Sequence, residues 1–124
     1  MERKINMPEY KLGEVEMKFA DIIWENEPIA SGELVKLSNK ELQWKKSTTY
    51  TILKRLCERG IFQNVDGIVT SLVTKEQFKS KKSEAFLEEN FGGSLPSFVA
   101  AFASGRKLSK AEIDSLMKLI EESR

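Results

Sequence analysis

The fold is decided by the stretch from Trp44 to Gly60, which reads WKKSTTYTILKRLCERG. A helix is predicted to begin at Lys46 or Ser47, and a glycine that follows a basic residue is typical of a helix C-terminus. The apolar spacing predicts one buried face, at Thr49, Ile52, Leu53 and Leu56. The outward face is therefore polar, with hydroxyl groups and basic side chains, and comprises Ser47, Thr48, Thr51, Lys54, Arg55 and Glu58.

Two further helical patterns precede this segment. The first runs from about Gly13 to Asn26, with apolar residues at Leu12, Val15, Phe19, Ile22 and Ile23, and Pro28 ends it. The second is shorter; it is predicted to start with Ser31 as its N-cap and to fade at Ser38 and Asn39. Three helices in succession, the last of them basic, are thus expected.

A β-hairpin pattern follows Gly60. Ile61 and Phe62 form a short apolar pair, residues 68–73 are rich in β-branched side chains, and the Asp66-Gly67 pair between them is a strong hairpin-turn signal. Three helices and a hairpin are the element order of a winged helix-turn-helix, in which the third helix enters the major groove of DNA. The predicted fold class is therefore mainly α with a small β-hairpin wing, and residues 1–73 are the expected DNA-binding domain.

The rest of the chain, residues 74–124, is expected to be a helical dimerisation domain. Helices are predicted from Thr74 to about Asn90, from Leu95 to Ser104 and from Ser109 onward. About fifty residues are too few to bury so many large apolar side chains alone, so a second copy of the chain is the simplest cover. The apolar stripe expected to be buried in this way comprises Phe98, Val99, Phe102, Ile113, Leu116 and Ile120.

The overall charge gives no basic signature, because 20 Lys and Arg residues face 19 Asp and Glu residues. Positive charge is instead local. Between Trp44 and Arg59 it is opposed by a single acid, Glu58. Nucleic-acid binding can therefore be argued only for this segment.

Several classes of protein are disfavoured by the composition. The chain has no histidine, one cysteine and no glycine-rich phosphate loop, so we expect no enzyme, no catalytic residue, no metal site and no cofactor. It has no stretch of about 20 apolar residues and residues 1–8 lack the apolar segment of a secretory signal, so we expect no membrane insertion and a cytoplasmic location.

Two side chains, Cys57 and Trp44, have two interpretations each, and Trp24 has one. Cys57 is expected to be a small core residue, with redox sensing as the alternative. Trp44 is expected to pack in the connection before the third helix, with stacking on nucleic acid as the alternative. Trp24 is expected in the core.

A resemblance to a known family is carried by segments that occur in the same order along almost the whole chain. These segments are Leu12–Glu16, Ile23–Trp24, Trp44–Leu56, Gly60, Phe91–Leu95 and Leu108–Ile113. Taken together they resemble the penicillinase-repressor (BlaI/MecI/CopY) family of winged-helix transcriptional repressors. The tail has no cysteine pair of the kind that the copper-responsive branch carries, and Ile68 stands where many members have a basic residue on the wing.

The resemblance implies a homodimer that represses β-lactamase or related operons by binding palindromic operator DNA. It also implies a membrane-bound sensor system that acts indirectly, by causing cleavage of the repressor. The matching bond here is Ala101-Phe102, where alanine replaces the family's asparagine. Recognition-helix contacts carry over onto Lys46, Ser47, Thr48, Thr51 and Arg55; with the neighbouring Lys45 and Lys54 these are the predicted DNA-binding residues.

A second function remains open from the residues alone. A winged helix can serve as a protein-protein interaction module without specific DNA binding, and its basic helix is then merely solvated. Salt-dependent binding to duplex DNA separates the two functions, because phosphate contacts release counterions.

Overall fold

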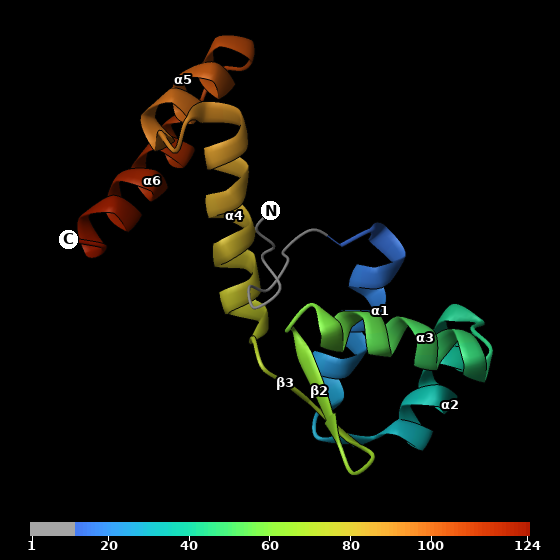
Figure 1. The fold of residues 1–124 in the computed structure, drawn as a ribbon. Coiled ribbons are helices and arrows are strands. Elements are labelled where there is room, and N and C mark those ends of the chain that lie inside the picture. The colour runs from blue at the N-terminus through green and yellow to red at the C-terminus, as the bar shows by residue number, and fades with distance from the viewer. Residues whose placement is uncertain (1–11) are drawn as a thin grey trace, which may run out of the picture. The chain divides into compact units, whose positions relative to one another are not determined.

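The computed structural model describes residues 12–124, so the N-terminal segment that we assessed for a secretory signal lies outside the described residues. The elements are α1 (Glu14–Asn26), β1 (Ile29–Ala30), α2 (Ser31–Leu42), α3 (Lys46–Glu58), β2 (Phe62–Val65), β3 (Ile68–Ser71), α4 (Lys75–Phe91), α5 (Leu95–Gly105) and α6 (Lys110–Glu122) (Figure 1). The predicted class, mainly α with a hairpin wing, is confirmed. No helix in the described part of the chain is long and apolar enough to span a bilayer.

Two compact units divide within α4, between Ser83 and Glu84. This is ten residues beyond the expected boundary at Val73, because the first turns of α4 pack into the N-terminal core. Phe78 is fully buried there, and its ring centroid lies 5.6 Å from that of Trp24. The indole Nε1 of Trp24 also donates to the Val73 carbonyl at 3.0 Å, which ties α1 to the chain entering α4. The assignment of DNA binding and dimerisation to residues 1–73 and 74–124 stays a prediction.

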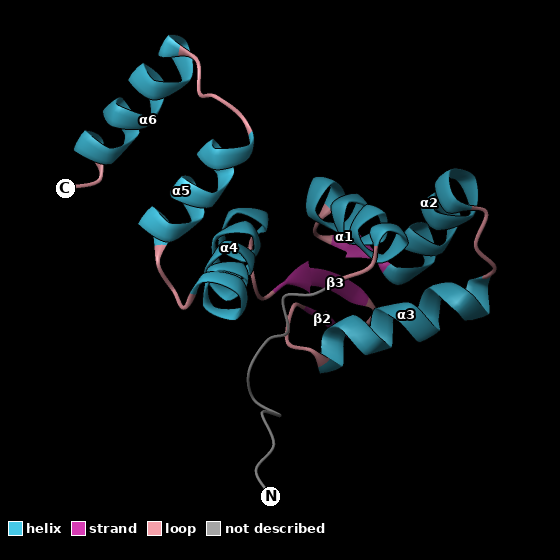
Figure 2. Cartoon of the chain, turned by 90° about the horizontal axis from the view of Figure 1, so that it is seen from above, coloured by secondary structure: helices cyan, strands magenta, loops and turns pink. Residues whose placement is uncertain are grey.

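In the N-terminal unit, three helices and a small sheet enclose one apolar core. Figure 2 shows α1, α2 and α3 grouped beside strands β2 and β3. The expected core position of Trp24 is confirmed in part, since its ring is partly buried against the core. Fully buried apolar residues come from every layer: Phe19, Ile23, Leu34, Leu56, Ile61, Phe62, Val69 and Phe78.

Helix α1 begins at the predicted place. The Glu16 carboxylate accepts a hydrogen bond from the Gly13 N–H at 3.0 Å, which satisfies one of the free donors at the helix start. The prediction that Val15 belongs to the buried face is wrong. Val15 lies in the first turn, one turn before the fully buried residues begin at Phe19, and it is exposed.

Helix α2 is longer than predicted. It ends at Leu42 rather than Asn39, because Leu42 packs against the core and Gln43, with φ 58°, closes the helix in the left-handed conformation. The predicted N-cap is also wrong. Ala30 takes that position, and the hydroxyl of Ser31 instead accepts a hydrogen bond from Tyr50 at 3.1 Å.

The sheet has three antiparallel strands in the order β1-β3-β2, where the sequence predicted only the hairpin. Strand β1 was missed because it is two residues long; Ile29 pairs with Val69 and Ala30 with Ile68. The predicted turn is confirmed. Asp66 (φ 52°) and Gly67 (φ 82°) both adopt the left-handed conformation that a two-residue hairpin loop requires.

The C-terminal unit contains the end of α4 together with α5 and α6. Four phenylalanine rings, from Phe86, Phe91, Phe98 and Phe102, contact one another in sequence with centroids 5.5–6.2 Å apart. No residue of α5 or α6 is buried. In the single chain Phe102, Ile113, Leu116 and Ile120 are exposed, and Phe98 and Val99 are half-buried, so burial of this stripe against a second copy stays a prediction.

Candidate DNA-binding site

Helix α3 is oriented by the few residues that it buries. Thr49, Leu53 and Leu56 are buried, and Ile52 is partly buried against the core, as the periodicity predicted. The Thr49 hydroxyl donates to the Lys45 carbonyl at 3.1 Å, so this buried polar group is satisfied within the helix. Burial of this face leaves the opposite face of α3 in solvent.

The exposed face of α3, together with its N-cap residue Lys45, carries every predicted DNA-binding residue. Ser47, Thr48 and Thr51 are separated by one and three residues, so their hydroxyl groups lie on one side of the first two turns. The first-turn N–H groups at this end also attract anions such as phosphates. The residues that the structure brings together here, all exposed, are Lys45, Lys46, Ser47, Thr48, Thr51, Lys54 and Arg55.

The basic residues of α3 differ in their partners. Lys45, Lys46 and Lys54 form no ion pair with any carboxylate of residues 12–124. Arg55 differs, because its Nη1 lies 3.6 Å from Oε2 of Glu16 on α1. Nη1 of Arg59 lies 3.8 Å from the other oxygen of the same carboxylate. Glu16 thus places a negative charge beside the C-terminal half of α3.

Sequence reasoning missed this role of Glu16. No pattern in the sequence relates position 16 to positions 55 and 59. The contact arises because α1 and α3 pack in the same core, which is a tertiary effect.

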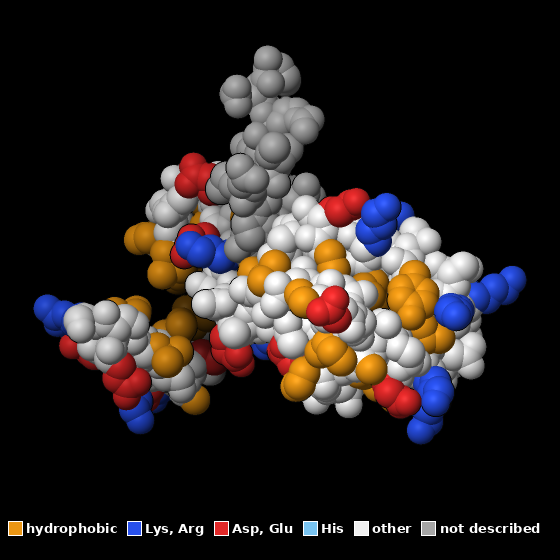
Figure 3. All heavy atoms as spheres, turned by 60° about the horizontal axis from the view of Figure 1, so that its bottom comes forward, with side chains coloured by type: hydrophobic (Ala, Val, Ile, Leu, Met, Phe, Trp, Pro, Cys, Tyr) orange, Lys and Arg blue, Asp and Glu red, His pale blue; other side chains and the backbone are white. Residues whose placement is uncertain are grey.

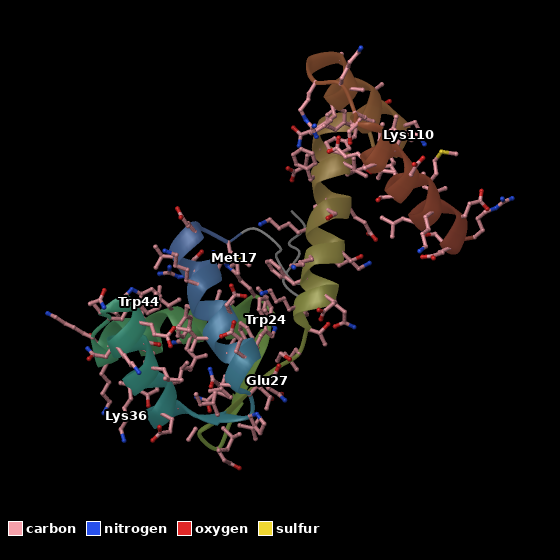
Figure 4. The ribbon with its side chains drawn as sticks, turned by 180° about the vertical axis from the view of Figure 1, so that it is seen from behind. Met17, Trp24, Glu27, Lys36, Trp44 and Lys110 are labelled. Atoms are coloured by element: carbon pink, nitrogen blue, oxygen red, sulfur yellow. The ribbon has the colours of Figure 1, made fainter. Side chains whose placement is uncertain are left out.

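The hairpin wing is held firmly but carries no basic side chain in residues 62–71. The Glu27 carboxylate, at the end of α1 (Figure 4), accepts hydrogen bonds from the Ser71 N–H at 2.7 Å and the Ser71 hydroxyl at 2.9 Å. The Glu27 side chain therefore holds β3 at Ser71, beyond Val69, where β1 has not yet begun. Ile68 is exposed beside the turn. A phosphate contact from the wing would have to use polar groups such as Gln63 and Asn64.

An apolar groove of about 600 Å³ lies on the C-terminal unit, between α5 and α6. Figure 3 shows orange hydrophobic side chains reaching the surface of these helices, at the left of the view. At the rim, Arg106 pairs with Glu112 at 2.9 Å and its guanidinium lies 4.7 Å from the centre of the Phe102 ring. The lining includes the apolar side chains of Phe98, Val99, Phe102, Leu116 and Ile120.

Comparison with known proteins identifies the family. The model of the penicillinase repressor family matches residues 12–122, nearly the whole chain. This chain belongs to the penicillinase repressor family. The family consists of transcriptional repressors rather than enzymes, in agreement with the expectation from composition. The resemblance stated from the sequence is confirmed.

Individual relatives of this repressor are similar over most of their length. It is 28% identical to the penicillinase repressor of Bacillus licheniformis, over 90% of this chain and 91% of that one. It is 26% identical to the methicillin resistance regulatory protein MecI of Staphylococcus aureus, over 91% and 95% of the two chains. A penicillinase repressor of Staphylococcus aureus is 24% identical, over 82% and 84%.

Two side chains near α3 have packing positions in the repressor. Cys57 is partly buried against the core, and burial, followed by the charge of Glu58, raises the pKa of its thiol. A raised pKa keeps the thiol protonated, which disfavours the redox alternative. The Trp44 ring packs on Phe19 with centroids 5.0 Å apart (Figure 4), as expected for a packing residue.

Proposed function

We propose that this penicillinase-family repressor is a cytoplasmic homodimer that binds a palindromic operator through the N-terminal half of α3. The observation that carries the proposal is the exposed face of this helix, where three lysines without an acidic partner among residues 12–124 flank three hydroxyl groups. Lysines attract the phosphates of DNA of any sequence, whereas hydroxyl groups that contact base edges discriminate between sequences. The six side chains are Lys45, Lys46, Ser47, Thr48, Thr51 and Lys54.

The C-terminal unit supports the dimer. A single chain leaves large apolar side chains on α5 and α6 in water, and a second copy removes them from it. A two-fold dimer also presents two α3 helices to two half-sites, so that the second contact becomes intramolecular. We propose that the interface uses Phe98, Val99, Phe102, Ile113, Leu116 and Ile120.

The regulated genes are proposed from the relatives. Two of the similar proteins are named penicillinase repressors and another is named a methicillin resistance regulatory protein. We propose that this repressor controls β-lactamase or another antibiotic-resistance gene of that type.

We propose further that repression ends by cleavage of the Ala101-Phe102 bond, through a membrane sensor and protease system that acts indirectly. Both residues of this bond are exposed in the single chain. A cut there separates α6 and the end of α5 from the rest, and removes much of the proposed interface. Mass spectrometry of the repressor from β-lactam-treated cells tests this: a fragment beginning at Phe102 supports it, and an intact chain during full derepression refutes it.

DNA binding is tested by fluorescence anisotropy with a duplex that the purified repressor selects from a random pool, and with a random duplex of equal length. We expect Thr51→Ala to weaken binding to the selected duplex by about 1–3 kcal/mol and to change binding to the random duplex little, since hydroxyl contacts read bases. We expect Lys46→Ala to weaken binding to both duplexes and to reduce the salt dependence of the affinity.

A matched control is Lys36→Ala on α2 (Figure 4), since this exposed lysine pairs with Glu33 at 3.3 Å and lies outside α3. This variant should change the affinity for neither duplex. Equal losses on both duplexes for Thr51→Ala would refute base reading. No salt-dependent binding to any duplex would favour the alternative, a protein-protein interaction module.

A further inference from the structure

The ion pairs of Glu16 indicate a limit on DNA affinity that is built into the winged-helix unit. The Glu16 side chain is only 20% exposed, and its Oε1 is fixed by the hydrogen bond from the Gly13 N–H at 3.0 Å. This carboxylate is therefore held in place by its own helix, and an arginine near it has a fixed partner.

Arg55 lies where it can reach either Glu16 or DNA. It follows Thr51 by four residues, one turn further along the exposed face of α3, and its side chain is 49% exposed. Its Nη1 is nevertheless directed to within 3.6 Å of Glu16. Arg55 is also in the C-terminal half of α3, whereas recognition helices contact base edges mainly through their N-terminal residues.

Arg59 adds to the same local charge balance. It lies one turn beyond Arg55, and its Nη1 is 3.8 Å from Oε1 of Glu16. One carboxylate therefore lies against two guanidinium groups and reduces the positive charge that this end of α3 presents. Lys45, Lys46 and Lys54 have no such partner among residues 12–124.

We propose that Glu16 limits the affinity of the repressor for DNA by holding Arg55 away from the phosphate backbone. This inference rests on the proposed DNA binding through α3, and it assigns Arg55 a different role from the contact that the family resemblance implies. The phosphate contacts of α3 come from Lys45, Lys46 and Lys54. Arg55 is a positioning residue that joins α3 to α1.

The test is a double-mutant cycle in the full-length chain, measured by anisotropy with the selected and the random duplex over a range of salt concentrations. Glu16→Gln keeps an amide oxygen that can accept from the Gly13 N–H, so α1 keeps its cap. We expect it to raise the affinity for both duplexes by a factor of roughly 1.5 to 5, the range for exposed ion pairs. The slope of log K against log salt steepens by about 0.9 for each new phosphate contact.

Arg55→Gln removes the arginine partner of the same ion pair. We expect it to leave the affinity for both duplexes within about twofold, because the wild-type Arg55 does not contact DNA. In the double variant Glu16→Gln with Arg55→Gln, the gain from Glu16→Gln disappears. A purely structural role of Glu16 would not produce a steeper salt slope that depends on Arg55.

Glu14→Gln is the matched control, since Glu14 lies in the same first turn of α1 and forms no ion pair with the described residues. Equal effects of Glu14→Gln and Glu16→Gln would overturn the proposal, because the effect would then be one of net charge. A tenfold loss with Arg55→Gln, or a loss with Glu16→Gln, would also overturn it and show that Arg55 reads DNA. If the wild-type chain binds no duplex, the proposed function itself fails.

Discussion

Truncation of Ile120 at the proposed dimer face should weaken the dimer without affecting the fold of the chain. Burying a whole isoleucine side chain is worth about 1.5–3 kcal/mol. Ile120 is 57% exposed in the single chain, so about 0.9–1.7 kcal/mol per chain remains to be gained on association. A symmetric dimer contains this site twice. Because alanine retains part of the burial, Ile120→Ala should cost about 1.4–2.5 kcal/mol, which raises the dimer Kd roughly 10- to 70-fold.

Sedimentation equilibrium of the wild type and Ile120→Ala measures this Kd, and circular dichroism checks that helicity is unchanged. The control is Leu72→Ala, which truncates an apolar side chain that is 53% exposed but belongs to the other compact unit. It should leave the Kd unchanged. An unaltered Kd for Ile120→Ala, or equal changes in both variants, would refute the assignment of the dimer face to α5 and α6.

Three other predictions concern pH, packing and the thiol. Hydrogen bonds from Arg106 hold the pKa of Glu112 at about 2, so the stability that they provide is complete above the ordinary carboxyl pKa and is lost as pH falls towards 2. The difference in melting temperature between pH 6 and pH 3 should therefore be smaller for Glu112→Gln than for the wild type, and an equal difference would contradict this. Trp24→Phe leaves the Val73 carbonyl without its donor and should cost about 1–3 kcal/mol in urea unfolding, and a cost below about 0.5 would contradict this. Because burial raises the pKa of Cys57, a thiol reagent should label it more slowly in the native than in the unfolded repressor, and equal rates would count against its packing position.

The elements with strong local signals could be predicted from the sequence. The buried face of α3 follows from its periodicity, because Thr49, Leu53 and Leu56 recur at helical spacing and the core simply receives them. The Asp66-Gly67 turn follows from backbone chemistry, because few other residue pairs adopt positive φ at both positions. Both signals are local, so they need no knowledge of what lies nearby.

The features that were missed depend on partners far apart in the chain. Strand β1 forms because β3 offers a free edge to Ile29 and Ala30, and two residues are too few to carry a pattern. Helix α2 continues to Leu42 because the core receives that side chain. The pairing of Arg55 with Glu16 joins residues from the third and first helices. The sequence could place Arg55 on the exposed face of α3, but only the packed structure shows which group it contacts there.

The two exposed surfaces of the repressor, on α3 and on α5 and α6, differ in how favourable their exposure to water is. The face of α3 is polar, so it is stable in water when no DNA is present. Exposure of the apolar stripe on α5 and α6, including Phe102 and Ile120, to water is unfavourable, and this cost disappears when another surface covers the stripe. Under the proposed function, two chains associate before they bind the operator, and the second α3 then binds at the high effective concentration that the proposed dimer provides. A change that separates the C-terminal helices should then weaken operator binding without altering any residue of α3.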